Sequence, residues 1–572
     1  MSTTISRQIQ RIAGAITALF LASCASVNTT PVQVSLIGLN DFHGNLQPPA
    51  GSVTLGDTKV QAGGAAHLAA LISQLKARNP GHTLVVAAGD MVGASPLASA
   101  LFHDEPSIDA LGQMGLDISS VGNHEFDKGR DELLRLQRGG CLAPSADGRL
   151  GRVGVDTCMN DGKFSGAKFT YLAANVIDQR SGQTLLPATA MRTVGGVQIG
   201  FIGLTLKDTP SVVTPAGVAG LRFEDEVATV NALAPQLKAA GAAAIVVLIH
   251  QGGATTATSV NDKTCPGFTG EIVAIVDRFD AAVDVVISGH THQEYVCTRP
   301  DGPLVTQTGS HGRVASAIEL TIDPVARKVL RKSADNVVAL RDHKDAAIDV
   351  LVTRYADLVG PITSAVVGKL AGPLTRTANA AGESTLGAVV ADAFLAATSD
   401  ASYGARPAQI AFTNPGGVRA DLAGSAEVSY GQLYAVMPFG NNLITLDLSG
   451  AQLLRLLEQQ WEAPQPAGGR ILPVSQGFSY SWDAAKPEGA AAGRGQRVVP
   501  GSMRLQGVPI DMQQTYRVTV NSYLASGGDR FSVLTEGKNA QQGVVDLDAT
   551  VAWFRTRDSM PAPAQQRIRR LH

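Results

Sequence analysis

Short apolar segments rich in β-branched residues recur along the first half of the chain and alternate with helical patterns. Each segment is bounded by Gly, Asn or Asp, which is typical of buried strands. A helical pattern over His67–Arg78 stops at Pro80 and Gly81. This alternation predicts a layered α/β architecture. The predicted strands are Val34–Leu39, Leu84–Ala88, Val197–Leu204, Ala244–Ile249 and Val283–Ser288.

A second region with different patterns follows a polar helical segment at Leu340–Leu358. In that region Ser449 can cap a helix through Ala451–Trp461, with Gln452 three residues after the cap. The two regions share no motif, and no internal repeat is visible. We therefore expect two different α/β domains, the second one smaller. The expected limits are 32–339 for the first domain, 340–360 for a linker helix and 361–572 for the second domain.

Composition excludes several classes of protein. The 572 residues are enough for more than one domain with its own core. Lys and Arg number 47 against 49 Asp and Glu, so the net charge of −2 gives no positive field for a nucleic-acid polymer. Hydrophobic residues at 44% and charged residues at 17% describe a globular chain. No apolar run reaches the roughly 18 residues that a membrane-spanning helix needs.

The N-terminus is typical of an export signal. Arg7 and Arg11 precede an apolar stretch at Ala13–Ala22, and small residues lead to Cys24. This end resembles a bacterial lipoprotein signal, in which the cysteine is lipidated and becomes the first mature residue. The resemblance implies a signal peptide at 1–24, a tether at 25–31 and a lipid anchor in the outer membrane, facing the periplasm. The alternative is an ordinary signal cleaved nearby, with Cys24 incidental.

The remaining cysteines agree with an oxidising compartment. Four of the five cysteines lie beyond Cys24, an even number that suits disulfide pairing. Three pairings are open, and we favour Cys141 with Cys158 and Cys265 with Cys297 because these close the shortest loops. A zinc cluster is the rival, but the chain has no C-x-x-C spacing.

Polar residues with metal-binding side chains follow most of the predicted strands. Open α/β sheets place ligand sites at the carboxyl ends of their strands. Asp, His and Asn supply oxygen and nitrogen donors that suit Zn, Mn, Co or Fe. Any one of these motifs is commonplace, but the ordered set predicts two metal ions that share a carboxylate. The donors offered are Asp41, His43, Asp90, Asn123, His250, His290 and His292.

The set D-x-H, G-D, G-N-H-E, H-Q-G-G and G-H-T-H resembles the calcineurin-like metallophosphatase superfamily. More narrowly, the segments LNDFHGNL at Leu39–Leu46 and GNHEFD at Gly122–Asp127, together with the second region, resemble the bacterial 5′-nucleotidase and UDP-sugar hydrolase family. The likeness covers nearly the whole mature chain. It implies a four-layer α/β/β/α sandwich followed by a smaller α/β domain that binds the nucleotide.

The resemblance also implies roles for these residues. One metal ion, Zn, Mn or Co, would be held by Asp41, His43, Asp90 and His292, and the other by Asp90, Asn123, His250 and His290. Position 292 is a departure, since relatives often carry Gln or Asn there. His124 and Asp127 match a catalytic dyad. A hydroxide generated at the metals is expected to attack phosphorus while His124 assists the leaving oxygen. The less favoured alternative for Asp127 alone is an N-terminal cap of a helix over Lys128–Arg138.

The second region offers candidate substrate contacts. Two aromatic side chains can sandwich a base, Asp529 can accept from ribose or base, and Arg419 can pair with phosphate. By resemblance, the substrate-binding residues are Asn414, Arg419, Phe439, Tyr523, Asp529 and Arg376. Tyr523 stands where relatives often have Phe. Gly382, Glu383 and Ser384 stand where many relatives have Arg-Glu-x, so one cationic contact is expected to be missing, with weaker affinity for multiply charged di- and triphosphates. Because the half-sites lie in separate domains, we expect closure about a hinge near Val359–Thr363.

The expected protein is thus a monomeric, exported phosphohydrolase of nucleotide catabolism that releases phosphate from nucleoside 5′-monophosphates, and from UDP-sugars in addition. The same metal centre also suits a 2′,3′-cyclic nucleotide 2′-phosphodiesterase, a UDP-sugar pyrophosphatase or a thiosulfohydrolase. From another class, a surface binding protein with a vestigial metal site remains an alternative, although the donor set is complete.

Overall fold

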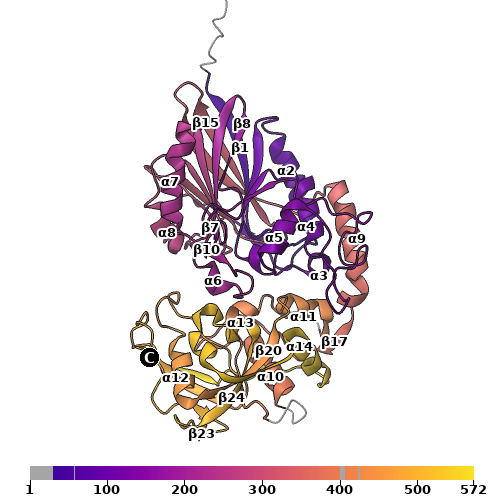
Figure 1. Ribbon diagram of the computed structural model, residues 1–572, viewed down its shortest axis with the longest axis vertical. Helices are drawn as coiled ribbons and strands as arrows, with labels where there is room; N and C mark the ends of the chain where they lie inside the picture. Colours follow the sequence, from indigo (N-terminus) through magenta and orange to yellow (C-terminus); the bar gives the residue numbers. More distant parts are fainter. Residues whose placement is uncertain (1–29, 57, 400–405, 423–425) are drawn as a thin grey trace, which may run out of the picture.

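The computed structural model describes residues 30–56, 58–399, 406–422 and 426–572. The predicted signal peptide, Cys24 and most of the tether lie outside these residues. The chain forms two lobes, an N-terminal lobe built on two large sheets and a C-terminal lobe beneath it (Figure 1). Among the described residues, none of the helices has the length and apolar character needed to span a bilayer.

Two six-stranded sheets form the N-terminal lobe. All five predicted strands are present, as β1, β4, β9, β11 and β12. The order of the first sheet is β16 (Lys328–Val338), β15 (Val314–Asp323), β1 (Val32–Leu39), β4 (Thr83–Ala88), β5 (Ile118–Ser120) and β6 (Thr170–Leu172). The order of the second is β13 (Glu294–Cys297), β14 (Leu304–Thr308), β12 (Val285–Ser288), β11 (Ala244–His250), β9 (Val197–Thr205) and β8 (Thr189–Val194).

The sheets pack face to face, and helices cover their outer faces. Leu36 and Val246 belong to the core between the sheets, whereas Ile37, the next residue of β1, belongs to the core under the helices. Both faces of β1 are therefore buried, which explains its continuous apolar run. The predicted four-layer sandwich is confirmed. Helices α2 (Ala65–Lys76), α4 (Glu105–Gln113) and α5 (Arg130–Arg138) cover the first sheet, and α7 (Glu226–Ala239) and α8 (Glu271–Val276) cover the second.

The C-terminal lobe is a smaller mixed α/β unit. Its larger sheet has the order β18 (Ile410–Ala411), β24 (Thr515–Asn521), β20 (Asn442–Ser449) and β25 (Lys538–Val545). A smaller sheet has the order β23 (Val508–Pro509), β22 (Arg504–Leu505), β21 (Phe478–Asp483) and β26 (Ile568–Leu571). The surrounding helices are α10 (Thr385–Thr398), α11 (Tyr430–Val436), α12 (Gly450–Glu458), α13 (Ser522–Ala525) and α14 (Asp546–Arg555). The predicted capping box of α12 is present, since Ser449 and Gln452 bond each other's backbone N–H groups.

Short elements connect these units. They are β2 (Val53–Leu55), β3 (Thr58–Val60), α3 (Leu97–Ala100), η1 (His124–Phe126), β7 (Val176–Asp178), α6 (Thr209–Val212), β10 (Leu221–Phe223), β17 (Val366–Lys369), η2 (Pro415–Gly417), β19 (Glu427–Ser429), η3 (Gly528–Arg530) and η4 (Ser532–Glu536).

Helix α9 (Ala346–Thr363) leads from one lobe to the other (Figure 1). It begins later than the predicted start at Leu340, because Leu340 forms a β-bridge with Ala62 and Asp345 caps the helix at Ala347 and Ile348. It also ends later, so the residues expected to act as a hinge form its last turns. We keep the hinge at Val359–Thr363 as a prediction.

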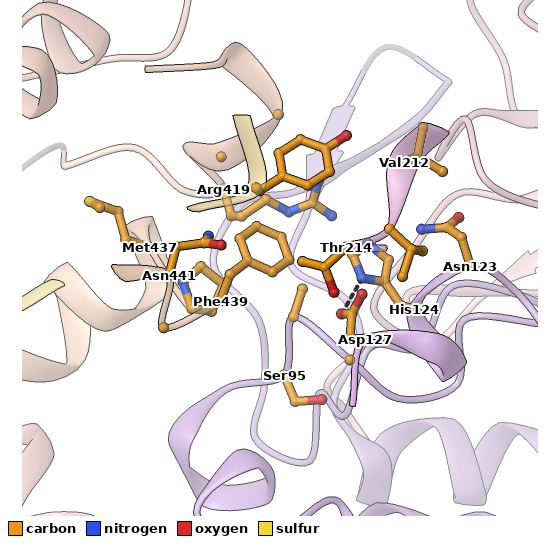
Figure 2. Close-up of a pocket in the computed structure, with 18 of the residues that line it drawn as sticks. Ser95, Asn123, His124, Asp127, Val212, Thr214, Arg419, Met437, Phe439 and Asn441 are labelled. Carbon is orange, nitrogen blue, oxygen red and sulfur yellow. Dashed lines mark hydrogen bonds and ion pairs between the residues drawn. The ribbon is translucent and has the colours of Figure 1, made fainter. Parts of the chain in front are cut away.

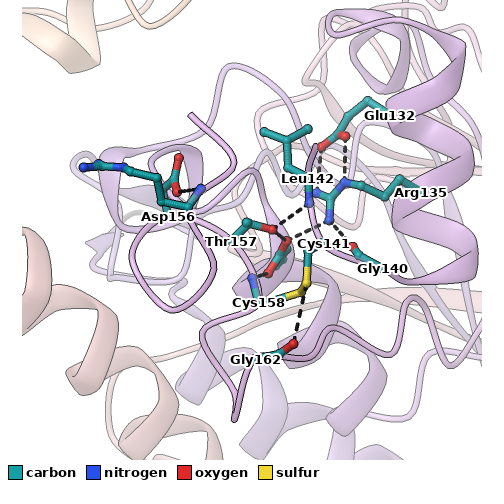
Figure 3. The surroundings of a disulfide bond; sticks show 11 residues. Glu132, Arg135, Gly140, Cys141, Leu142, Asp156, Thr157, Cys158 and Gly162 are labelled. Atoms are coloured by element: carbon teal, nitrogen blue, oxygen red, sulfur yellow. Dashed lines mark hydrogen bonds and ion pairs between the residues drawn. A yellow bond between two sulfur atoms is a disulfide. The ribbon is translucent and has the colours of Figure 1, made fainter. Parts of the chain in front are cut away.

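Both favoured disulfides, Cys141–Cys158 and Cys265–Cys297, are present. The loop closed by the first is tied to the lobe by Arg135, which donates to Gly140 O and pairs with Glu132 (Figure 3). Beyond the loop, Arg354 of α9 donates to Met159 O at 2.7 Å and to Asn160 Oδ1 at 2.6 Å. Arg354 therefore joins the connecting helix to the chain just beyond this disulfide.

Removing this disulfide is expected to destabilise the protein. The double variant Cys141→Ser with Cys158→Ser loses the restraint on the unfolded chain, at a cost of about 2–4 kcal/mol for a loop of this size. The melting temperature without reductant checks the result. Added reductant should lower the melting temperature less in the variant than in the wild type, because the variant already lacks one of the two bonds. An unchanged melting temperature in the variant would show that the bond does not contribute to stability.

Candidate active site

The predicted metal donors gather where the carboxyl ends of both sheets meet. Asp41 follows β1, Asp90 follows β4 and Asn123 follows β5 in the first sheet. His250 ends β11 and His290 follows β12 in the second. The side chains of all seven predicted donors come together, although they are spread along the chain from Asp41 to His292.

One group of donors consists of Asp41, His43 and His292. His292 Nε2 lies 3.1 Å from both Asp41 Oδ1 and His43 Nε2. The Nδ1–H of His43 donates to the carbonyl oxygen of Gly93 at 2.9 Å, which leaves the lone pair on Nε2. Metal-binding histidines commonly have this second bond to a backbone carbonyl, because it orients the ring and fixes its tautomer.

A second group centres on Asp90 and His250. His250 donates Nδ1–H to Ala88 O at 2.8 Å, so in the neutral ring the lone pair is on Nε2, which lies 2.9 Å from Asp90 Oδ2. This nitrogen is buried and makes no hydrogen bond to any described residue. Nearby, His290 Nδ1 lies 3.1 Å from Asn123 Oδ1. Asp90 Oδ2 is also 3.7 Å from His43 Nε2, so Asp90 lies between the two groups.

These groups fit divalent metal ions. A ring nitrogen 2.9 Å from a carboxylate oxygen needs positive charge between the two atoms, which either a proton or a metal ion can supply. Burial alone would lower the pKa of His250, but the carboxylates of Asp90 and Asp41 raise it to about 10, so the site favours positive charge at this point. The mixture of carboxylate, imidazole and amide donors suits first-row metals, and no thiolate takes part.

The backbone is strained at these donors. Asp41, His43, Asp90, His290 and His292 have φ values of 49°, 49°, 51°, 72° and 54°. Non-glycine residues seldom adopt this left-handed conformation, which costs on the order of 1–3 kcal/mol each. Five such residues around one point indicate a functional site, because this conformation lowers stability rather than raising it.

Glu125 organises the loop that carries Asp90, a role that we did not assign from the sequence. Its buried carboxylate accepts the backbone N–H groups of Asp90 at 2.9 Å, Met91 at 2.8 Å and Gly122 at 2.5 Å. Burial and the charge of Asp90 raise the pKa of Glu125 to about 7. A Cβ on Gly122 would lie 2.2 Å from Asp90 Oδ1, so only glycine fits there. The G-N-H-E motif contained this signal, because both residues belong to it.

His124 and Asp127 form a hydrogen-bonded pair beside these donors. His124 Nδ1 lies 2.6 Å from Asp127 Oδ2 (Figure 2). Asp127 does not cap the next helix, since α5 begins at Arg130 and its N-cap is Gly129. Burial alone would lower the pKa of His124, but Asp127 and Asp90 outweigh it and raise the pKa above its ordinary value. The ring therefore favours the imidazolium form.

A cavity of about 550 Å³ extends from this pair into the C-terminal lobe. Phe439 stacks on His124 with ring centroids 5.7 Å apart and an angle of 11° between the planes. The guanidinium of Arg419 lies 5.8 Å from the centroid of the same phenyl ring, so all three groups lie close together (Figure 2). Five of the six predicted substrate residues line the cavity, namely Asn414, Arg419, Phe439, Tyr523 and Asp529.

The carboxylate of Asp529 is the centre of a hydrogen-bond network. Asn414 Nδ2 donates to its Oδ2 at 2.8 Å, and the Tyr523 hydroxyl lies 3.0 Å from its Oδ1. Arg470 forms an ion pair with the same oxygen. Sequence reasoning missed Arg470, and it also missed the cavity residues Val212, Val213 and Thr214 of the N-terminal lobe. Nothing in their local sequence marks them as binding residues.

Arg376 does not line the cavity. Its side chain is 49% exposed and its Nε lies 3.5 Å from Asp421 Oδ1, so it faces a carboxylate rather than the cavity. In the segment where many relatives have Arg-Glu-x, Gly382 takes the place of the arginine, and the neighbouring Glu383 is buried and accepts the backbone N–H of Arg567 at 2.8 Å. Arg470 lines the cavity and supplies a positive charge there, whereas the cavity lining includes no residue of the 382–384 segment.

Two family models match the chain. Residues 35–294 match the calcineurin-like phosphoesterase domain, and residues 366–536 match the C-terminal domain of 5′-nucleotidases. Together they cover both lobes.

Known proteins with similar sequences and structures include nucleases and nucleotidases. The endonuclease YhcR of Bacillus subtilis is 30% identical over 92% of this chain, which spans 40% of the length of that relative. The NAD 5′-nucleotidase of Haemophilus influenzae is 26% identical over 90% of this chain and 88% of its own. The crystal structure of a 5′-nucleotidase precursor from Thermus thermophilus aligns with a TM-score of 0.73 and 27% identity over 94% of this chain and 99% of the other. The chain therefore belongs to the 5′-nucleotidase family of phosphoester hydrolases, in which a calcineurin-like phosphoesterase domain precedes a 5′-nucleotidase C-terminal domain.

Proposed function

We propose that this protein is a dinuclear-metal phosphohydrolase that releases phosphate from nucleoside 5′-monophosphates outside the cytoplasm. The domain limits we propose are 32–339 for the metallophosphatase domain and 361–572 for the substrate-binding domain. The observation that carries the proposal is the single cavity shared by the His124–Asp127 pair and by the aromatic and charged residues of the C-terminal lobe. One substrate can therefore contact both groups at once.

The metal-binding roles follow the two donor groups. One ion would be held by Asp41, His43, Asp90 and His292, and the other by Asp90, Asn123, His250 and His290. In both sets Asp90 takes part, which agrees with its place between His43 and His250. When bound, two such ions supply Lewis-acid activation of the phosphate and of the attacking water.

The other charged residues act on the substrate itself. In the imidazolium form His124 donates a proton from Nε2 to the leaving nucleoside oxygen, since Nδ1–H is engaged by Asp127. Asp127 keeps the ring in this orientation and stabilises its charge. Arg419 is half-buried beside the cavity and compensates the negative charge of the phosphate. Closure of the lobes excludes water from these interactions.

We propose that the nucleoside is held against Phe439 and Tyr523, with Asp529 and Asn414 accepting and donating to ribose or base. Replacing Phe439 by alanine is expected to raise KM for AMP about 5- to 100-fold, because one stacked base contributes roughly 1–3 kcal/mol. Steady-state kinetics check the result. The matched control, Phe439→Tyr, keeps the stacking face and should stay near the wild type. A KM for AMP unchanged in Phe439→Ala would contradict the stacking role.

Phosphodiesters and UDP-sugars are the second candidate class of substrates. The cavity continues past Asp127 to Lys128, Glu132 and Asp104, so it has room for a group attached to the far side of the phosphate. The similarity to an endonuclease is in line with diester chemistry on the same fold.

We also propose export and a lipid anchor on Cys24 in the outer membrane. The two disulfides support an oxidising compartment. If the anchor exists, a Cys24→Ser variant moves from the membrane fraction to the soluble fraction. Equal membrane retention of both forms would reject it.

One experiment tests the proposed activity. The mature protein, purified with Mn²⁺ or Zn²⁺, is assayed for phosphate release from AMP, UDP-glucose, 2′,3′-cyclic AMP and bis(p-nitrophenyl) phosphate, with an added phosphatase to reveal diester cleavage. AMP is expected to be the best substrate. A preference for the cyclic nucleotide would favour the diesterase reading, and no turnover on any of the four would reject the proposal.

A further inference from the structure

A short segment of the N-terminal lobe reaches across to the nucleoside end of the cavity. This segment, Asp208–Thr214, contains α6, which projects toward the C-terminal lobe next to α13 (Figure 1). Its residues Val212, Val213 and Thr214 line the cavity together with Phe439 and Tyr523 of the other lobe. The nucleoside end of the cavity is therefore built by both lobes.

Two polar contacts join this segment to the C-terminal lobe. The Tyr523 hydroxyl lies 3.1 Å from the carbonyl oxygen of Ser211. Arg530 forms an ion pair with Asp208 at 2.6 Å, with side chains that are 29% and 60% exposed. Of the two C-terminal residues, Tyr523 precedes the turn at Asp529 and Arg530 belongs to it. In this turn Asp529 and Arg530 have φ values of 53° and 66°. The ion pair thus helps to hold a strained turn that carries a substrate residue.

The Tyr523 hydroxyl has a single proton and two acceptors within reach. It accepts the backbone N–H of Asp529 at 2.9 Å, and it can donate either to Ser211 O at 3.1 Å or to Asp529 Oδ1 at 3.0 Å. When the proton goes to Ser211, one lone pair of Asp529 Oδ1 becomes free for a substrate hydroxyl. When the lobes separate, Ser211 is withdrawn and the proton returns to Asp529. The hydroxyl that distinguishes Tyr523 from phenylalanine therefore links lobe contact to the state of Asp529.

We propose that Asp208–Thr214 is a positioning element of the nucleoside site, whose contacts with Tyr523 and Arg530 hold the lobes together and release Asp529 for a ribose hydroxyl. This role rests on the proposed function, because it concerns nucleoside recognition. Simple phosphoesters without a nucleoside, such as p-nitrophenyl phosphate, do not need the released carboxylate. Selection for nucleosides is therefore coupled to closure of the cavity.

Kinetics of three variants test the coupling. Asp208→Asn and Arg530→Gln are each expected to raise KM for AMP about 2- to 5-fold, as for loss of one exposed ion pair, with p-nitrophenyl phosphate turnover unchanged. Tyr523→Phe leaves Asp529 free in either arrangement of the lobes, so adding Asp208→Asn to it should raise KM for AMP less than Asp208→Asn does alone. The charge exchange Asp208→Arg with Arg530→Asp should restore KM, since aspartate tolerates the left-handed conformation at position 530. Arg455→Gln, which breaks the Arg455–Glu536 pair within one lobe, is the matched control.

A distance measurement separates this role from the proposed activity. Fluorescent labels at Val325→Cys and Val508→Cys, which are 56% and 65% exposed on the two lobes, report their separation without any substrate. Asp208→Asn and added salt should both lengthen the mean distance, and Arg455→Gln should not. If the wild type hydrolyses AMP but Asp208→Asn changes neither KM nor the distance, the positioning role is wrong. If the wild type hydrolyses no nucleotide, the proposed function fails and the nucleoside role fails with it, even where the distances respond.

Discussion

Replacing Asp90 by alanine is expected to lower kcat by roughly three orders of magnitude or more, because one substitution removes a donor from both metal groups. Asp90 Oδ2 lies 2.9 Å from His250 Nε2 and 3.7 Å from His43 Nε2, and Asp90 Oδ1 accepts the backbone N–H of His124. The variant thus loses the proposed shared ligand and a contact to His124, the proposed general acid. Phosphate release from AMP with saturating Mn²⁺ checks the result.

Metal content distinguishes this cause from unfolding. Asp90→Ala should bind less metal than the wild type while keeping its melting temperature in the presence of chelator, and chelator alone should abolish turnover of the wild type until metal is restored. Asp117→Asn is the matched control, because that carboxylate accepts the N–H of Val85 at the opposite end of the same sheet. Near-normal turnover of Asp90→Ala in the metal-replete assay would remove Asp90 from the reaction.

Replacing His124 by alanine is expected to lower kcat about 10²- to 10⁴-fold with little change in KM, as for loss of a general acid. Asp127→Asn should cost less, because it leaves the ring in place but removes the charge that stabilises the imidazolium. The double variant should be no slower than His124→Ala, since Asp127 acts only through that ring. Kinetics with AMP and with p-nitrophenyl phosphate give the test, since the activated leaving group of the latter needs less help from an acid.

The control for this pair lies outside the cavity. His103 and Asp156 also form a histidine–carboxylate contact, at 3.4 Å, in the same lobe. His103→Gln should leave kcat near the wild-type value. If the losses in His124→Ala and Asp127→Asn add up independently, the two residues do not work as a unit.

Much of the architecture could be predicted from local patterns. The five apolar runs became strands of the two sheets, and the capping box at Ser449 and Gln452 formed as expected. Such features depend on residues a few positions apart, whose spacing is visible in the sequence. The start of α9 was predicted less accurately, because the β-bridge of Leu340 with Ala62 joins segments far apart in the chain.

The site, too, was predicted from the sequence only in part. The chemistry of the donors and their positions after buried strands were enough to predict which side chains would gather, because parallel strands end at one edge of a sheet. The orienting role of Glu125 was not predicted, since its three backbone partners become neighbours only when two loops meet. Arg376 shows the reverse case, in which a motif match suggested a cavity residue but the folded chain turns it to Asp421.

Local sequence therefore specifies the two lobes and the set of candidate metal donors, since strand ends and residue chemistry are encoded within short segments. Tertiary structure alone decides how the proposed nucleoside end of the cavity is closed. Ser211 and Tyr523 are 312 positions apart, and the hydroxyl of Tyr523 meets the Ser211 carbonyl only because the lobes pack against each other. No periodicity or motif marks a backbone carbonyl as a partner, because every residue has one.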